Sequence, residues 1–309
     1  MARRTNLALL AALATSFVSG VLSLWVGEGR VLLVAWAHGA AGFLVLLLVR
    51  WKVPVIRRGL RRHRPDAATS VLTAVVAVAM LATGIAHALG VAELGPLTLL
   101  GLHIALALAL VPLVAMHLTS RPARPRRGDL TRAGFLRLAG LAVAAVAFKA
   151  AFEGTVAASR APTGSLRRDS PLATSWINDS TPAVAANEWT ERMRGLAQRS
   201  VTCSLDCTSG WYSVNRWSGV AVADLLGPPP AGTRSVLVSS HTGYSRRFDI
   251  ADLPSLLLAT HLDGAPVPSG NGGPARLVAP GRRGFWWVKW VSRIDYSSRP
   301  PWWQLPFPI

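Results

Sequence analysis

Five apolar runs, each long enough to cross a membrane, constrain the fold of this chain more than any other feature. They cover residues 7–26, 31–49, 69–90, 97–118 and 133–152, and they consist mostly of Ala, Leu, Val and Gly. At a rise of 1.5 Å per residue, about 20 helical residues cover the ~30 Å hydrocarbon core of a bilayer. We therefore predict an all-α membrane domain of five transmembrane helices in residues 1–152.

The basic residues are concentrated beside these apolar runs. Of the 33 Lys and Arg that give the formal net charge of +18, seven lie between Arg50 and Arg64 and five between Arg121 and Arg132. Such clusters mark the cytoplasmic ends of membrane spans, so we interpret the charge as an orientation signal and predict no nucleic-acid partner. Cytoplasmic basic loops place the residues after the fifth run outside. The prediction is a multi-pass cell-membrane protein with an extracytoplasmic C-terminal domain.

A pair of arginines precedes the fifth apolar run. The segment Arg126-Arg127-Gly128-Asp129-Leu130 has the form of an internal twin-arginine export signal. Its other interpretation is an ordinary basic cytoplasmic flank, and the motif alone favours neither. A folded-protein export signal would be needed only if the outer domain folds around a cofactor before export.

The composition changes after the fifth apolar run. Residues 153–171 are rich in Arg, Ser, Ala and Pro, and we predict that they form a linker. In residues 172–309, short β-like runs alternate with turns of Gly, Pro, Asn and Asp, which indicates a strand-rich α+β domain. The predicted strands cover residues 200–205, 235–240, 275–279 and 286–294, and the predicted short helices cover residues 222–226 and 253–258.

Four histidines, His38, His87, His103 and His117, lie in the apolar runs. An imidazole inside a bilayer is costly unless it is bonded, so each is a candidate for function. His38 and His103 share a predicted depth of about 10 Å below the outer surface at 1.5 Å per residue. Two facing imidazoles suit a haem, so we predict one b haem on this pair, with His87 as a substitute ligand or a nearby group. The alternative is that the histidines only pack between helices.

Both cysteines of the chain lie in residues 200–226. Val201, Cys203 and Leu205 alternate with polar residues, which predicts a half-buried strand that ends near Cys207. Along a strand, these two cysteines would be about 13 Å apart, too far for a disulfide bond. A turn or helix here would allow the bond again. We predict a core thiol at Cys203 and a reactive or metal-binding thiolate at Cys207.

The same stretch resembles a known family. Cys207 is followed by Trp217-Ser218-Gly219 and then by Val222-Ala223-Asp224-Leu225-Leu226, which is similar to the molybdenum-ligand segment of the sulfite oxidase superfamily. Downstream, residues 271–281 and 284–290 resemble the pterin-binding segment of that family, N/H-G-x-P-x-R-L-V-x-P followed by G-x-x-x-V-K. The residues beside Cys207 differ from those of the vertebrate enzymes and of the methionine sulfoxide reductases. Residues 170–196 show little of the family pattern beyond Thr174-Ser175-Trp176.

The resemblance implies a molybdopterin cofactor and names its contacts. Cys207 would be the molybdenum ligand, because molybdenum in an oxygen-transfer site needs a soft thiolate besides the pterin dithiolene. The implied pterin contacts are Asn271, Arg276, Trp287, Val288 and Lys289, with Ser240 and His241 as weaker candidates that line the site. Arg276 and Lys289 would supply cations for the cofactor phosphate. Their other interpretation is a surface charge at Arg276 and a core or membrane-facing tryptophan cluster around Trp287.

Two functions from different classes follow. The first is a membrane-anchored molybdenum oxidoreductase that transfers an oxygen atom to or from a small sulfur compound. Its electrons would pass through the haem to or from a quinone or a redox partner protein. The second is a cofactor-free binding or scaffold protein that reuses the fold.

Overall fold

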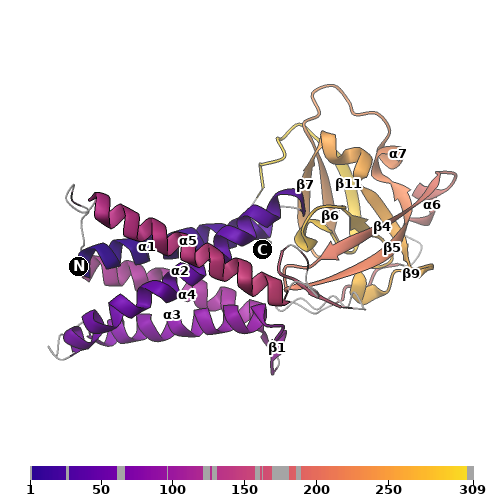
Figure 1. Cartoon of the computed structure of the whole chain (residues 1–309). Helices are drawn as coiled ribbons and strands as arrows, with labels where there is room; N and C mark the ends of the chain where they lie inside the picture. The colour runs from indigo at the N-terminus through magenta and orange to yellow at the C-terminus, as the bar shows by residue number, and fades with distance from the viewer. Residues whose placement is uncertain are drawn as a thin grey trace. The chain divides into compact units, whose positions relative to one another are not determined.

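The computed structural model describes residues 2–25, 28–60, 67–95, 97–120, 126, 131–156, 161, 163–168, 181–185 and 189–304. The chain divides into two compact units, Met1–Leu166 and Arg167–Ile309. Figure 1 shows long helices in the first unit and strands with short helices in the second. This confirms the predicted fold class.

Five helices of the first unit are long and apolar enough to cross a membrane. They are α1 (Ala2–Trp25), α2 (Glu28–Leu60), α3 (Ala67–Ala88), α4 (Leu99–Ser120) and α5 (Arg132–Val156). α2 continues well past residue 49, where the apolar run ends, because Lys and Arg favour a helix as strongly as most apolar residues do. α4 begins two residues later than predicted, since β2 (Leu97–Thr98) pairs with β1 (Glu93–Leu94) in a short hairpin.

Packing within this unit follows the helix pairs α1 with α2, α3 with α4, and α2 with α5. Ala12 of α1 meets Val45 and Leu48 of α2 in a small buried cluster. Large apolar side chains such as Leu33 and Val78 are instead exposed on the helix surfaces. An apolar exterior around a sparse interior is the pattern of helices whose solvent is lipid.

The second unit contains two antiparallel sheets. The larger has the order β10-β8-β5-β3, with β4 paired to β5 and β9 to β8; the smaller has the order β11-β6-β7. The strands of the larger sheet are β3 (Leu166–Arg167), β4 (Gln198–Asp206), β5 (Trp211–Ala221), β8 (Leu257–Leu262), β9 (Ala265–Pro266) and β10 (Arg276–Val278). Those of the smaller are β6 (Ser235–Ser240), β7 (Ser245–Asp249) and β11 (Val291–Ser297). The most buried side chains include Trp217, Trp287, Leu258 and Leu277.

Most predicted elements of this unit are confirmed. β4, β6 and β10 match three predicted strands, and α7 (Val222–Leu226) matches a predicted helix. The helix predicted at residues 253–258 is wrong: the 3-10 turn η3 (Ile250–Ser255) ends at a buried Leu256, and the chain then enters β8.

The strand predicted at residues 286–294 is wrong in its first half. The 3-10 turn η5 (Gly284–Trp286) occupies that position, and β11 begins only at Val291. Trp290 has a φ of 49°, which breaks the extended backbone before β11. The segment Thr174-Ser175-Trp176 and part of the predicted linker, residues 153–171, lie outside the described residues, while α5 continues to Val156.

Candidate functional site

Cys207 stands in the hairpin turn between β4 and β5. Its N–H donates to the carbonyl of Trp211 at 2.8 Å, and its carbonyl accepts from Gly210 at 3.1 Å. The backbone N–H of Ser209 lies 3.5 Å from Cys207 Sγ. The thiolate is the form of a cysteine side chain that binds a metal ion. Cys207 is half-buried and free, so this thiol is accessible for ligation.

Cys203 differs from its prediction. The strand ends at Asp206 as predicted, and Cys203 and Cys207 form no disulfide bond with each other. However, Cys203 is half-buried rather than in the core, because β4 pairs only with β5 and its first residues are exposed. The core position on this strand belongs to Leu205.

A buried ion pair joins the Cys207 turn to the loop before η5. Arg283 Nη1 donates to Asp206 Oδ2 at 2.9 Å, and the two side chains are only 6% and 5% exposed. Arg283 Nη2 also lies 3.4 Å from the carbonyl oxygen of Cys207. A Cβ on Gly284 would come within 2.9 Å of Cys207 Cα, so glycine permits this close approach. The thiol is therefore held against the segment that was predicted to bind the pterin.

Arg276 lies within electrostatic reach of the same thiol. Burial lowers the pKa of Arg276, and the electrostatic interaction with Cys207 partly offsets this effect, so that the pKa is about 10. Its Nη1 donates to the carbonyl of Asn271 at 2.8 Å, and its guanidinium lies 5.5 Å from the Trp217 ring and 5.8 Å from the Trp287 ring. Its Nε is buried without a hydrogen-bond partner among the described residues. Arg276 is thus a charged group at neutral pH, packed beside two indoles and within electrostatic reach of Cys207.

The five predicted pterin contacts come together because two segments pair by backbone bonds. Leu277 N–H donates to Val288 O at 2.8 Å, and Trp290 N–H donates to Gly272 O at 3.0 Å. Gly272 has a φ of 103°, and a Cβ there would meet Lys289 Cβ at 2.8 Å.

The predicted pterin contacts differ in how far their side chains are buried. Trp287 and Val288 are buried, whereas Lys289 carries its ammonium group over the Trp290 ring at 5.0 Å. Asn271 is buried at the end of η4 (Ser269–Asn271). Their roles toward a cofactor stay predictions.

Ser240 ends β6 and shapes the turn that follows. Its Oγ accepts from Thr242 N–H at 3.2 Å and lies 3.1 Å from Thr242 Oγ1. The backbone N–H of His241 donates to Trp290 O at 2.9 Å, which brings this turn beside the Lys289 segment. Ser240 is therefore near the site, and its proposed lining role stays a prediction.

Three charged residues of this region were missed by the sequence reasoning: Asp206, Arg283 and Arg246. Arg246 Nε donates to Tyr244 Oη at 2.7 Å, and its guanidinium lies 5.0 Å from the Phe285 ring. Tyr244 donates in turn to the carbonyl of Phe285, and burial raises the pKa of this tyrosine. A charged residue directly before Cys207 on a predicted half-buried strand was the signal that could have identified Asp206.

In the membrane unit, the structure brings His38 and His103 together. Their ring centroids are 6.0 Å apart and the rings are nearly perpendicular, at 85°. His38 Nδ1 lies 2.8 Å from Ser16 O, and His103 Nδ1 lies 2.9 Å from Met80 O. An N–H at each Nδ1 leaves each Nε2 as the free ligand nitrogen.

Glycines make room for both rings. A Cβ on Gly20 would lie 3.1 Å from His38 Cε1, and a Cβ on Gly84 would lie 3.0 Å from His103 Cε1. His117 Nδ1 instead lies 3.4 Å from Ser70 Oγ. Both rings of the predicted histidine pair are therefore packed against neighbouring helices. The His38 ring lies beside Gly20 of α1, and the His103 ring lies beside Gly84 of α3.

Comparison with known proteins concerns the second unit. Residues 180–303 match the family model described as oxidoreductase molybdopterin binding domain. The chain is 31% identical over 132 residues to the protein-methionine-sulfoxide reductase catalytic subunit MsrP of Xanthomonas axonopodis pv. citri, covering 36% of this chain and 40% of that protein. It is 30% identical over 110 residues to mitochondrial sulfite oxidase of Rattus norvegicus, covering 30% of this chain and 20% of that protein.

The second unit also resembles solved structures. The sulfane dehydrogenase SoxCD from Paracoccus pantotrophus aligns with a TM-score of 0.34 and 22% identity, covering 36% of this chain and 34% of that chain. The chain thus spans well under half the length of the relatives described here.

Proposed function

The second unit contains a molybdopterin-binding oxidoreductase domain homologous to MsrP and sulfite oxidase, and from this premise we propose that the chain is a membrane-anchored molybdenum enzyme. Its reaction is oxygen-atom transfer on a small sulfur compound, and its electrons are exchanged with the membrane. The observation that carries this proposal is the free Cys207 thiol, held in a rigid turn within electrostatic reach of the buried Arg276. We also propose that this domain lies outside the cytoplasm, because basic residues are concentrated in the loops that would then face the cytoplasm.

The residues present fit the cofactor chemically. Among the described residues, no group of three or more His, Cys, Asp or Glu could hold a metal ion. We propose Cys207 as the ligand that the protein would give to molybdenum. When bound, the molybdenum centre supplies two-electron oxygen-atom transfer. Arg276 keeps its proton at neutral pH because its pKa of about 10 lies well above it, so it offers a fixed positive charge beside the thiolate. Lys289 and the Gly-rich turn at residues 270–273 are proposed to hold the anionic end of the cofactor.

We propose that His38 and His103 of the membrane unit hold a haem, because their ring centroids lie 6.0 Å apart. Metal–imidazole bonds of ~2 Å let a metal ion sit between two rings whose centres are 6.0 Å apart. The carbonyls of Ser16 and Met80 would fix both rings in the tautomer that presents Nε2. We propose that this haem passes electrons between a membrane quinone and the molybdenum domain.

The test is the metal content, spectrum and activity of the purified full-length protein. Stoichiometric molybdenum and reduction of a methyl sulfoxide by dithionite-reduced viologen are expected for wild type. Cys207→Ser should abolish turnover at an unchanged protein level, and Cys203→Ser is the matched control that keeps it. Full activity in Cys207→Ser, or absence of molybdenum from the wild type, would refute the assignment; absence of both metals would favour a cofactor-free scaffold.

A further inference from the structure

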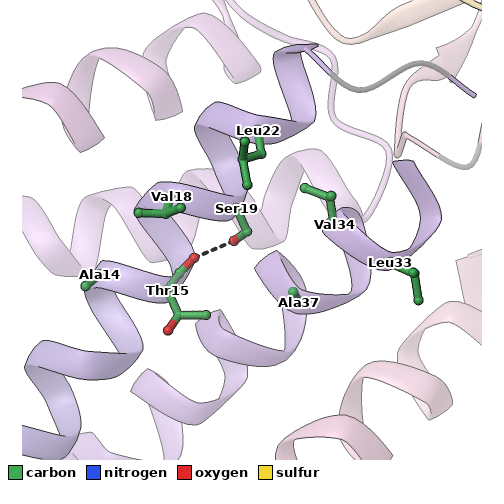
Figure 2. Close-up of a pocket in the computed structure, with 8 residues that line it drawn as sticks. All are labelled: Ala14, Thr15, Val18, Ser19, Leu22, Leu33, Val34 and Ala37. Carbon is green, nitrogen blue, oxygen red and sulfur yellow. Dashed lines mark hydrogen bonds between the residues drawn. The ribbon is translucent and has the colours of Figure 1, made fainter. Parts of the chain in front are cut away.

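A groove lies between α1 and α2, on the outer surface of the helices (Figure 2). Its volume is about 500 Å³, and it is lined by Ala14, Thr15, Val18, Ser19 and Leu22 of α1 and by Leu33, Val34 and Ala37 of α2. The lining carries no charged residue, and Val18, Leu22 and Leu33 are exposed around it. This size is within the range of small-molecule sites, and the apolar lining suits a ligand dissolved in lipid.

Ser19 gives this groove one buried polar group. The side chain is 6% exposed, and its Oγ lies 2.6 Å from Thr15 O and 3.1 Å from Ser16 O; Figure 2 shows the first of these bonds. A hydroxyl has one proton and two lone pairs. Because the proton of Ser19 is directed to the helix carbonyls, the hydroxyl has acceptor capacity left for a ligand that donates.

The groove is linked to the proposed haem ligand through one carbonyl. Ser16 O accepts from His38 Nδ1 at 2.8 Å and lies 3.1 Å from Ser19 Oγ. Ala37, which lines the groove, directly precedes His38 in α2. A molecule in the groove that donates to Ser19 would therefore be one carbonyl away from the imidazole.

We propose that this groove binds the head group of a membrane quinol, with a quinol hydroxyl donating to Ser19. This proposal rests on the proposed function and deepens it. Oxidation of the quinol to the quinone releases two electrons and two protons. If a haem is bound, His38 and His103 would hold the iron that accepts these electrons one at a time, and the protons would go to water. The molybdenum domain consumes two electrons and two protons when it reduces a sulfoxide to a sulfide and water.

A lipid acyl chain is the competing occupant of the groove. An acyl chain has no hydrogen-bond donor for Ser19 and no polar group that would favour a position near His38. The experiment uses the full-length protein in lipid nanodiscs and measures haem reduction by a short-chain quinol in stopped flow. Ser19→Ala removes the acceptor without adding bulk, and Ala14→Phe fills the groove. Ala109→Phe is the control, because Ala109 is an exposed alanine of α4 that does not line the groove.

Loss of one hydrogen bond of ~1.4 kcal/mol corresponds to about a tenfold slower haem reduction in Ser19→Ala. Ala14→Phe should be slowed at least as much, Ala109→Phe should match wild type, and the dithionite-reduced spectrum should be unchanged in all three. Quinol reduction at the wild-type rate in both groove variants would overturn the proposal and leave the groove to lipid.

A second readout separates this proposal from the haem assignment. A photoreactive azidoquinone should label a peptide containing residues 14–22 or 33–37 in wild type, and Ala14→Phe should remove the label. Labelling elsewhere would refute the groove even if a haem is present. Labelling at the groove in a protein without a Soret band would support the quinol site and refute the haem.

Discussion

Replacing Arg283 with methionine should destabilise the second unit far more than the same change at its neighbour Arg282. Arg283 and Asp206 form a buried pair with side chains 6% and 5% exposed, whereas Arg282 and Asp252 form a pair with side chains 37% and 25% exposed. Removing one partner of a buried pair leaves a charge in a poorly solvated position and costs about 3–5 kcal/mol. An exposed pair contributes ~0–1 kcal/mol.

The loss of the Arg283 side chain should also affect Cys207, the proposed molybdenum ligand. Arg283 contacts the Cys207 carbonyl, and the Asp206 carboxylate that it binds lies at the residue directly before Cys207. Domain stabilities are typically ~5–15 kcal/mol, so a loss of this size removes a large fraction. Arg283→Met should therefore also lower turnover, whereas Arg282→Met should leave it unchanged.

The assay is pulse proteolysis of the full-length protein across a urea series, following the fragment that contains the second unit. The double variant Asp206→Asn with Arg283→Met should recover part of the loss, because it removes the stranded carboxylate. Equal shifts for Arg283→Met and Arg282→Met, or a loss below ~1 kcal/mol in Arg283→Met, would refute the reasoning.

Three further predictions concern single residues. Gly284→Ala should reduce the molybdenum content, measured by elemental analysis, because the added Cβ would lie 2.9 Å from Cys207 Cα. An unchanged molybdenum content would show that the Cys207 turn can shift to accommodate the Cβ without losing the metal. His38→Ala should remove the reduced-minus-oxidised haem spectrum while molybdenum is retained, and an unchanged spectrum would assign the iron to other ligands. Folded Arg276 releases its proton near its pKa of about 10 and unfolded arginine only at a higher pH, so wild-type stability relative to Arg276→Met should rise as the pH increases above about 10. A falling difference by pulse proteolysis would contradict the assigned burial.

The membrane helices were predictable because hydropathy and length decide them almost alone. The ends of these helices were harder to predict. α2 continues through Pro54 to Leu60, although the apolar run stops at residue 49. Hydropathy reports where lipid ends, whereas a helix can continue into water on residues such as Lys and Arg that favour it.

In the second unit, local patterns predicted β4 and α7 but not the segment at residues 286–290. Its aromatic residues suggest a strand, yet the 3-10 turn η5 ends at Trp286 and β11 begins only at Val291, so residues 287–290 are irregular. Tertiary packing decided this segment, because Trp287 is buried against Trp217, which lies 70 positions earlier in the chain.

The candidate site was also only partly predictable from the sequence. Cys207 and Arg276 were predictable because short motifs carry them, and the structure places them within electrostatic reach of each other. The Asp206–Arg283 pair was missed because its members are 77 positions apart and neither belongs to a motif. His38 and His103 were paired only by their predicted depth, and helix packing supplied the facing geometry.

The central claim is that Cys207 binds molybdenum, and X-ray absorption at the molybdenum edge tests it most directly. Wild-type protein should show sulfur ligands from the pterin dithiolene together with one more from Cys207. The Cys207→Ser protein, if it retains molybdenum, should lose a sulfur ligand and gain an oxygen, while Cys203→Ser should match wild type. The same sulfur coordination in Cys207→Ser and wild type would contradict the assignment.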